Sequence, residues 1–136
     1  MVTPTPRKFK RYWRVAVLAN IKDESQPKPE GVPSDAFADF DHIETIQKIQ
    51  AAIESDGHET KFLMADRTLP KTLVDYDPDI CLNIAEGLGG DAREAHIPAL
   101  LEMLGYPYTG SRVLTNAISL DKTLTKRIWR DRRLPV

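Results

Sequence analysis

Residues 79–90, DICLNIAEGLGG, are the stretch of sequence that decides the fold class. Residues 79–85 are apolar at nearly every position, a pattern typical of a strand covered on both faces, as in a parallel sheet. Glu86 and three glycines follow directly. Because glycine accepts positive φ and lets a ligand approach the backbone closely, this loop is a predicted binding site. An ordinary turn would also use glycine, so the stretch alone leaves both interpretations open.

This strand belongs to a regular alternation of strand and helix patterns. Short apolar runs predict strands, and apolar residues at helical spacing predict the helices between them. We expect strands at 13–20, 58–65 and 79–85, a short strand or extended turn at 106–110, and helices at 41–57, at 68–77, from about 96 to 104 and from 111 onward. Such alternation predicts a small, doubly wound α/β fold, Rossmann-like, whose mainly parallel sheet is flanked by helices with right-handed crossovers.

The first predicted helix has a defined start and one apolar face. Asp41 is a favourable N-cap, and Glu44 three residues later completes a capping-box pattern. The isoleucines at 43, 46, 49 and 53 recur at helical spacing, which predicts a stripe packed on the sheet. In the second predicted helix, Pro70 should interrupt the helix early.

Composition and charge are those of one ordinary globular domain. The chain has 136 residues, 41% of them hydrophobic, and a formal net charge of −1, so it has no overall attraction to nucleic acid or anionic membrane. Residues 1–12 are basic and should form a flexible arm. No apolar stretch is long enough for a membrane span, and no signal-peptide core follows the arm. The single cysteine, Cys81, is expected to be a buried, inert thiol, and the absence of disulfides favours the cytoplasm.

Several common sites are excluded by their spacing. The glycines at 87, 89 and 90 follow the third strand, so they are neither a dinucleotide fingerprint nor a P-loop. The three histidines lack metal-ligand spacing, and we expect no metal site. In open parallel sheets, ligands bind beyond the carboxyl ends of the strands. The long loop 21–39, the glycine loop and the TGS turn at 109–111 all fall there.

From residue 83 to residue 135 the sequence resembles the N-terminal domain of D-alanine–D-alanine ligases. LLEMLGYPYTGS, residues 100–111, carries the resemblance, together with LDK eight residues later and TK two residues after that. It is similar in particular to divergent members that have NIAEG where others have a His-Gly pair. The resemblance implies a pre-ATP-grasp fold in an ATP-grasp enzyme. Such enzymes phosphorylate a carboxylate with ATP, and an amine then attacks the acyl phosphate to form an amide.

The resemblance also implies substrate-binding residues. Gly87 and Gly90 would supply backbone N–H donors to the substrate or to developing negative charge. Glu86 takes the place of a substrate-contacting histidine, and an anion there suits an ammonium group better than a carboxylate. Arg93 could then restore a carboxylate contact through its bidentate fork.

Two further residues follow from the same resemblance. Lys122, in LDK, matches a lysine that reaches ATP phosphates. Glu44 could act as the glutamate that opens the family's first helix, although a capping role explains it equally well. The first loop is longer and more acidic here than in the family.

The resemblance implies that residues 13–136 form a substrate-side domain without the ATP-binding domains. We therefore expect ATP and Mg²⁺ in the full-length parent but none bound to this chain, no catalytic residue within it, and no ligation by it alone. Its expected partners are a small amino acid or dipeptide, the remaining ATP-grasp domains and, through exposed apolar residues, a second copy in a homodimer. The alternative is a stand-alone flavodoxin-like module that binds a ligand or signals through the acidic loop. Nucleic-acid binding by the basic termini ranks last.

Overall fold

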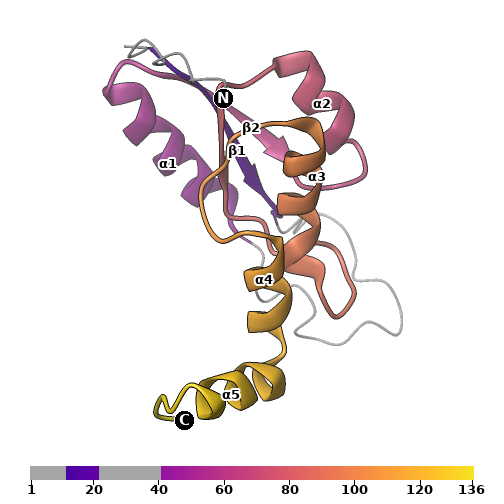
Figure 1. Ribbon diagram of the computed structural model, residues 1–136. Coiled ribbons are helices and arrows are strands. Elements are labelled where there is room, and N and C mark those ends of the chain that lie inside the picture. Colours follow the sequence, from indigo (N-terminus) through magenta and orange to yellow (C-terminus); the bar gives the residue numbers. More distant parts are fainter. Residues whose placement is uncertain (1–11, 22–40) are drawn as a thin grey trace, which may run out of the picture.

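The computed structural model describes residues 12–21 and 41–136 (Figure 1). The predicted basic arm, apart from Tyr12, and nearly all of the long acidic loop lie outside the described residues. The strands are β1 (Arg14–Ala19), β2 (Glu59–Met64) and β3 (Ile80–Asn83). The helices are α1 (Ile43–Ser55), α2 (Leu69–Tyr76), the short 3-10 helix η1 (Arg93–Ala95), α3 (His96–Leu104), α4 (Val113–Leu120) and α5 (Lys122–Asp131).

The three strands form a parallel sheet, as the alternation predicted, and their order in it is β2-β1-β3. β1 is central, with Val15 beside Thr60 of β2 and Ile80 of β3. The expected fourth strand at 106–110 is an extended segment that meets β3 at one position, where Tyr108 bridges Cys81. The N–H of Cys81 donates to the Pro107 carbonyl at 2.8 Å, and that of Thr109 donates to the Cys81 carbonyl at 2.9 Å.

Helices cover both faces of the sheet, which confirms the doubly wound α/β arrangement. Ala16 and Leu18 of β1 point into a core formed with α2 and α3, while Val17 and Ala19 point into a second core under α1. Figure 1 shows α1 on one side of the strands and α2 with α3 on the other. Fully burying one leucine side chain contributes roughly 1.5–3 kcal/mol, so these two faces hold the sheet in place.

The start of α1 corrects the predicted capping box. His42, not Asp41, is the N-cap, and no side chain caps this helix end. Asp41 instead pairs with Ile21 in a parallel bridge, and its N–H donates to the Asn20 carbonyl at 2.9 Å. Because that pairing keeps Asp41 extended, the helix begins two residues later. Ile46 is buried as expected, but Ile43 is exposed.

The region after residue 111 also differs from the single helix that was expected. Asp121 divides it into α4 and α5, because the Asp121 side chain accepts a hydrogen bond from the Leu124 N–H at 2.9 Å and so caps a new helix. Figure 1 shows α5 projecting away from the sheet. Pro70 lies in the first turn of α2 and does not interrupt that helix.

Coverage of β3 is less complete than its apolar sequence predicted. Only Cys81 of this strand is fully buried, and its neighbours are half-buried. A hollow of about 380 Å³ opens beside α1, on the face of the sheet that α1 covers. It is lined by Trp13, Val15, Ile53, His58, Ile80, Leu82 and Thr109. The reason is that α1 contacts mainly β2 and β1, leaving this side of β3 partly uncovered.

Candidate functional site

Asn20 connects the segments that follow the three strands, at the end of the sheet where the strands have their carboxyl ends. Its side-chain oxygen Oδ1 accepts a hydrogen bond from the Gly87 N–H at 2.9 Å. Its Nδ2 donates to the carbonyl of Ala65, just after β2, at 2.8 Å. The described residues that follow β1, β2 and β3 thus meet at the carboxyl end of the sheet.

The glycine loop folds tightly against the 3-10 helix that follows it. Gly87 is buried and has φ +78°, and a Cβ at this position would lie 2.3 Å from the carbonyl oxygen of Arg93. Only glycine fits there without moving the backbone. Gly90 also has positive φ, but it is exposed. The atom nearest to a Cβ added there would be the Cε1 of His96, at 3.8 Å.

A pocket of about 340 Å³ opens between this loop and the turn that leads into α4. Its walls come from the end of β3 with the residues after it, from η1, and from the Gly110 turn with the α4 helix that follows it. The lining residues are Asn83, Ile84, Ala85, Glu86, Glu94, Gly110, Ser111 and Asn116. Two carboxylates, two carboxamides and a hydroxyl therefore share one concave surface, a combination that can hold an ammonium group and a second polar group together.

Two hydrogen bonds hold the turn at 109–111 between β3 and α4. The N–H of Asn83 donates to the Thr109 hydroxyl oxygen at 3.2 Å, which joins β3 to the turn. Asn116 Nδ2 donates to the Ser111 carbonyl at 3.1 Å, which joins the turn to α4. These bonds fix the turn against the sheet and so keep the pocket open on a rigid frame.

The predicted substrate residues take different places around this pocket. Glu86 lines it, half-buried, and Gly87 lies directly behind, with its N–H bonded to Asn20. Arg93 is half-buried in η1, where its carbonyl packs on Gly87. Neither Arg93 nor Gly90 is among the lining residues. Their contacts with a ligand stay predictions.

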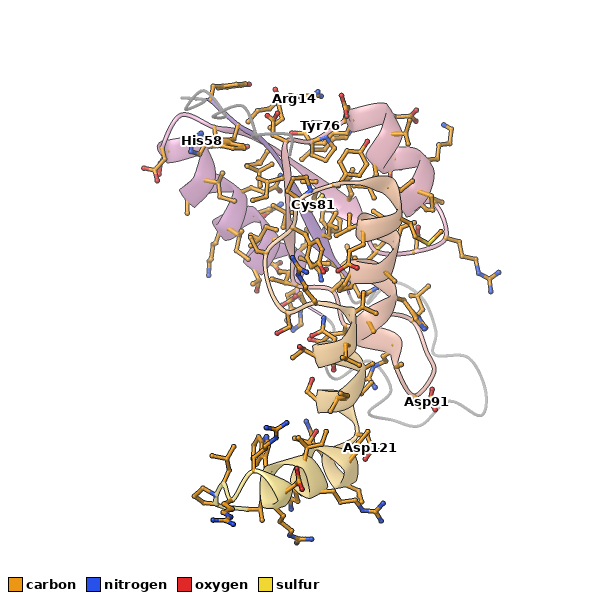
Figure 2. The ribbon with its side chains drawn as sticks, viewed as in Figure 1. Arg14, His58, Tyr76, Cys81, Asp91 and Asp121 are labelled. Carbon is orange, nitrogen blue, oxygen red and sulfur yellow. The ribbon has the colours of Figure 1, made fainter. Side chains whose placement is uncertain are left out.

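Glu44 and Lys122 lie apart from the pocket lining. Glu44 is exposed in the first turn of α1, where its charge favours the helix N-terminus. Lys122 is exposed at the start of α5, and its Nζ donates to the Ser119 carbonyl at 3.4 Å. In Figure 2 the neighbouring Asp121 lies at the junction of α4 and α5, far from Arg14 and Tyr76. The ligand roles of both residues stay predictions.

Sequence reasoning missed four residues of this region: Asn20, Asn83, Glu94 and Asn116. Asn20 carried a weak signal, because a polar residue ended an apolar strand at its carboxyl end. Glu94 follows the glycine loop but has no motif of its own. Asn116 could not be found in this way, because only the tertiary fold brings α4 beside β3.

The thiol of Cys81 is buried in the sheet, as predicted. Burial raises its pKa to about 12, so the thiol stays protonated at neutral pH. Figure 2 shows Cys81 in the middle of the strands, between the helix layers. Nearby, desolvation raises the pKa of Tyr108, and so does its hydrogen bond to Glu102 at 2.7 Å.

Two features are absent from the described ranges, 12–21 and 41–136. No group of three or more His, Cys, Asp or Glu side chains is placed there to hold a metal ion. Within the same ranges, none of the helices combines the length and the apolar character that a membrane crossing requires.

Comparison with known proteins gives relatives along most of the chain. No protein-family model matches it. A curated protein of Sinorhizobium fredii, named uncharacterized protein y4sG, is 35% identical over 139 residues, which covers 90% of this chain and 39% of that protein. The D-alanine–D-alanine ligase of Moorella thermoacetica is 37% identical over 87 residues, or 64% of this chain and 28% of the ligase.

A solved structure agrees in fold. The D-alanine–D-alanine ligase of Bacillus anthracis, in its complex with ATP, superposes with a TM-score of 0.61 at 24% identity over 88% of this chain and 36% of the ligase chain. This chain thus spans between about a quarter and two fifths of the length of these relatives. In sequence and in fold, the chain resembles the N-terminal domain of D-alanine–D-alanine ligases, as LLEMLGYPYTGS indicated.

Proposed function

We propose that residues 13–136 are the substrate-side domain of an ATP-dependent carboxylate–amine ligase of the D-alanine–D-alanine ligase type. One observation carries this proposal. Glu86, in the segment that resembles these ligases, lines a polar pocket at the carboxyl end of β3, where α/β folds bind their ligands. A curated ligase that is 37% identical over 87 residues supports the reaction class.

In this proposal the pocket binds a small amino acid or a dipeptide. The carboxylates of Glu86 and Glu94 would hold the substrate ammonium, because opposite charges attract strongly at a partly desolvated site. The carboxamide of Asn116 and the hydroxyl of Ser111 can donate hydrogen bonds to the substrate's polar atoms. The guanidinium of Arg93 would turn towards the substrate carboxylate and bind it through two parallel N–H bonds.

The glycine loop has two roles in this proposal. Gly90 is exposed, so its backbone would approach the substrate without a side chain in the way. The Gly87 N–H already donates to Asn20, so it would act on a ligand only if that bond were exchanged. Glu44 would contact the substrate from the start of α1.

ATP supplies the phosphoryl group that converts the substrate carboxylate into an acyl phosphate, with Mg²⁺ held by other domains of the parent protein. Lys122 would reach the ATP phosphates from the start of α5. This chain's own contribution would be to bind the substrate and orient its reacting groups. The loss of translational and rotational entropy then occurs on binding and no longer adds to the activation barrier. The amine would then attack the acyl carbon, so that the C–N bond forms while the acyl C–O bond to phosphate breaks and the amine loses a proton.

Binding is tested on residues 1–136 labelled with ¹⁵N and titrated with D-alanine, L-alanine and D-alanyl-D-alanine. We expect shifts at the amides of Glu86, Gly110 and Asn116. Glu86→Gln should weaken binding about tenfold or more at an unchanged melting temperature. The matched control is Asp91→Asn, which removes a carboxylate of the same loop that does not line the pocket (Figure 2).

Turnover is tested on the full-length parent by measuring phosphate release from ATP with mixtures of amino acids. Release that depends on an amino acid supports the ligase. No release with any mixture would overturn it. Binding by this chain without any turnover by the parent would favour the stand-alone binding module.

A further inference from the structure

Asn20 is the one buried side chain with an amide or a charged group in the part of the chain that the structure describes. It is 2% exposed and follows directly after β1. Both ends of its carboxamide are used, since Oδ1 accepts from the Gly87 N–H at 2.9 Å and Nδ2 donates to the Ala65 carbonyl at 2.8 Å. Its main-chain carbonyl accepts from the Asp41 N–H at 2.9 Å. One residue therefore connects the segment after β2, the segment after β3 and the start of the segment that leads into α1.

This position requires a carboxamide. A buried polar group destabilises the fold unless its hydrogen bonds are made, so an apolar residue would be the simpler choice at the end of a buried strand. Asparagine offers an acceptor and a donor at once, which matches the Gly87 N–H and the Ala65 carbonyl. An ionised aspartate could accept from Gly87 but could not donate to Ala65. A leucine of similar size would leave both backbone groups unpaired.

The hydrogen bond from the Gly87 N–H to Asn20 affects Glu86, the pocket residue that precedes Gly87. Gly87 is held from one side by Asn20, and on the other side it packs on the Arg93 carbonyl so closely that no Cβ fits. Glu86 is the adjacent residue, so the direction of its side chain depends on the peptide that joins it to Gly87. The sheet itself does not need this bond, because β1 pairs with β2 and β3 through its own backbone.

We propose that Asn20 is a positioning residue of the pocket: its carboxamide fixes the Gly87 peptide and thereby aims the Glu86 carboxylate. The effect on substrate binding rests on the proposed function, whereas the effect on the Gly87 peptide does not. Asn20 acts through Gly87 and Glu86 and does not itself line the pocket.

The first measurement follows the Gly87 amide by hydrogen exchange in ¹⁵N-labelled residues 1–136. Asn20→Leu should speed exchange at Gly87 at least tenfold relative to the amides of β1 in the same variant. Asn20→Asp keeps the acceptor for Gly87 but loses the donor to Ala65, so this ratio should rise less than it does in Asn20→Leu. The matched control is Val17→Ala, a core truncation in the same strand on the α1 face, which should speed exchange broadly without singling out Gly87.

The second measurement is the dissociation constant for D-alanine. Asn20→Leu should raise it about tenfold or more, whereas the control Val17→Ala should leave it within about threefold. If Asn20→Leu fails to fold, Asn20→Ser replaces it, because the shorter hydroxyl does not reach both partners.

The outcomes separate the two proposals. Unchanged relative protection of Gly87 in Asn20→Leu or Asn20→Ser would overturn the positioning role. A loosened Gly87 with unchanged affinity for D-alanine would overturn its link to the pocket. A wild-type chain that binds none of the amino-acid probes would count against the proposed function, while the exchange data would still decide whether Asn20 holds the loop.

Discussion

Gly87→Ala is the sharpest test of how the glycine loop is built. The change has two costs in the structure. Alanine at φ +78° loses roughly 1–2 kcal/mol, because its Cβ crowds its own backbone in the left-handed region. The same Cβ would lie 2.3 Å from the Arg93 carbonyl oxygen, and relieving such an overlap by backbone movement costs about 1–3 kcal/mol. We expect the free energy of unfolding to fall by about 2–5 kcal/mol.

Gly57→Ala is the matched control. Gly57 has φ +84°, close to that of Gly87, but a Cβ there would meet nothing within 4 Å. The control therefore carries the backbone cost alone, roughly 1–2 kcal/mol. The difference between the two variants isolates the close approach of Gly87 to Arg93.

Both variants are measured by urea unfolding at 25 °C, followed by circular dichroism and by tryptophan fluorescence. Coincident transitions with an unchanged m-value would permit a two-state comparison. Equal losses for Gly87→Ala and Gly57→Ala, within about 0.5 kcal/mol, would refute the tight packing of the loop on η1. A larger loss for Gly57→Ala would refute it as well.

Three further predictions concern other parts of the chain. Leu101→Ala should lower the free energy of unfolding by about 2–5 kcal/mol in urea titrations, because Leu101 is fully buried where α3 meets the sheet. Cys81 should react with a thiol reagent at pH 8 only when urea unfolds the chain, and rapid labelling of the folded chain would contradict its burial. Its pKa is raised on folding from 9.0 to about 12, so stability should be lost as pH rises from 9 towards 12, and less steeply in Cys81→Ala. Asp121→Ala should raise hydrogen exchange in the first turn of α5, since it removes the cap on Leu124, and unchanged exchange there would contradict the cap.

The fold was predictable where its cause is local. The strand at 79–85 shows in its apolar run, and the helix after residue 41 shows in the spacing of its isoleucines. Both patterns depend only on residues that are close together in the chain. Boundaries were less predictable. The capping box at Asp41 obeys every local rule, yet pairing with Ile21 and Asn20 holds Asp41 outside the helix. The same limit applies after residue 111, where the pattern continues but Asp121 starts a new helix.

The site was predictable in part for the same reason. The glycine loop and Glu86 stand out in the sequence, because glycine signals unusual backbone and a carboxylate beside it signals chemistry. Glu94 and Asn116 have no such mark, and Asn116 joins the pocket after the chain has returned past β3 through the Tyr108 bridge.

By itself, the sequence determined where the three strands and most of the helices lie, that the sheet is parallel with helices on both faces, and that a glycine loop with Glu86 follows β3. Local sterics and the spacing of apolar residues are sufficient for that. Only the tertiary structure decided that Asn20 ties the loop to the sheet and that Glu86, Glu94 and Asn116 share one pocket. Those relations depend on hydrogen bonds and packing between residues far apart in the chain, and no pattern of neighbouring residues encodes them.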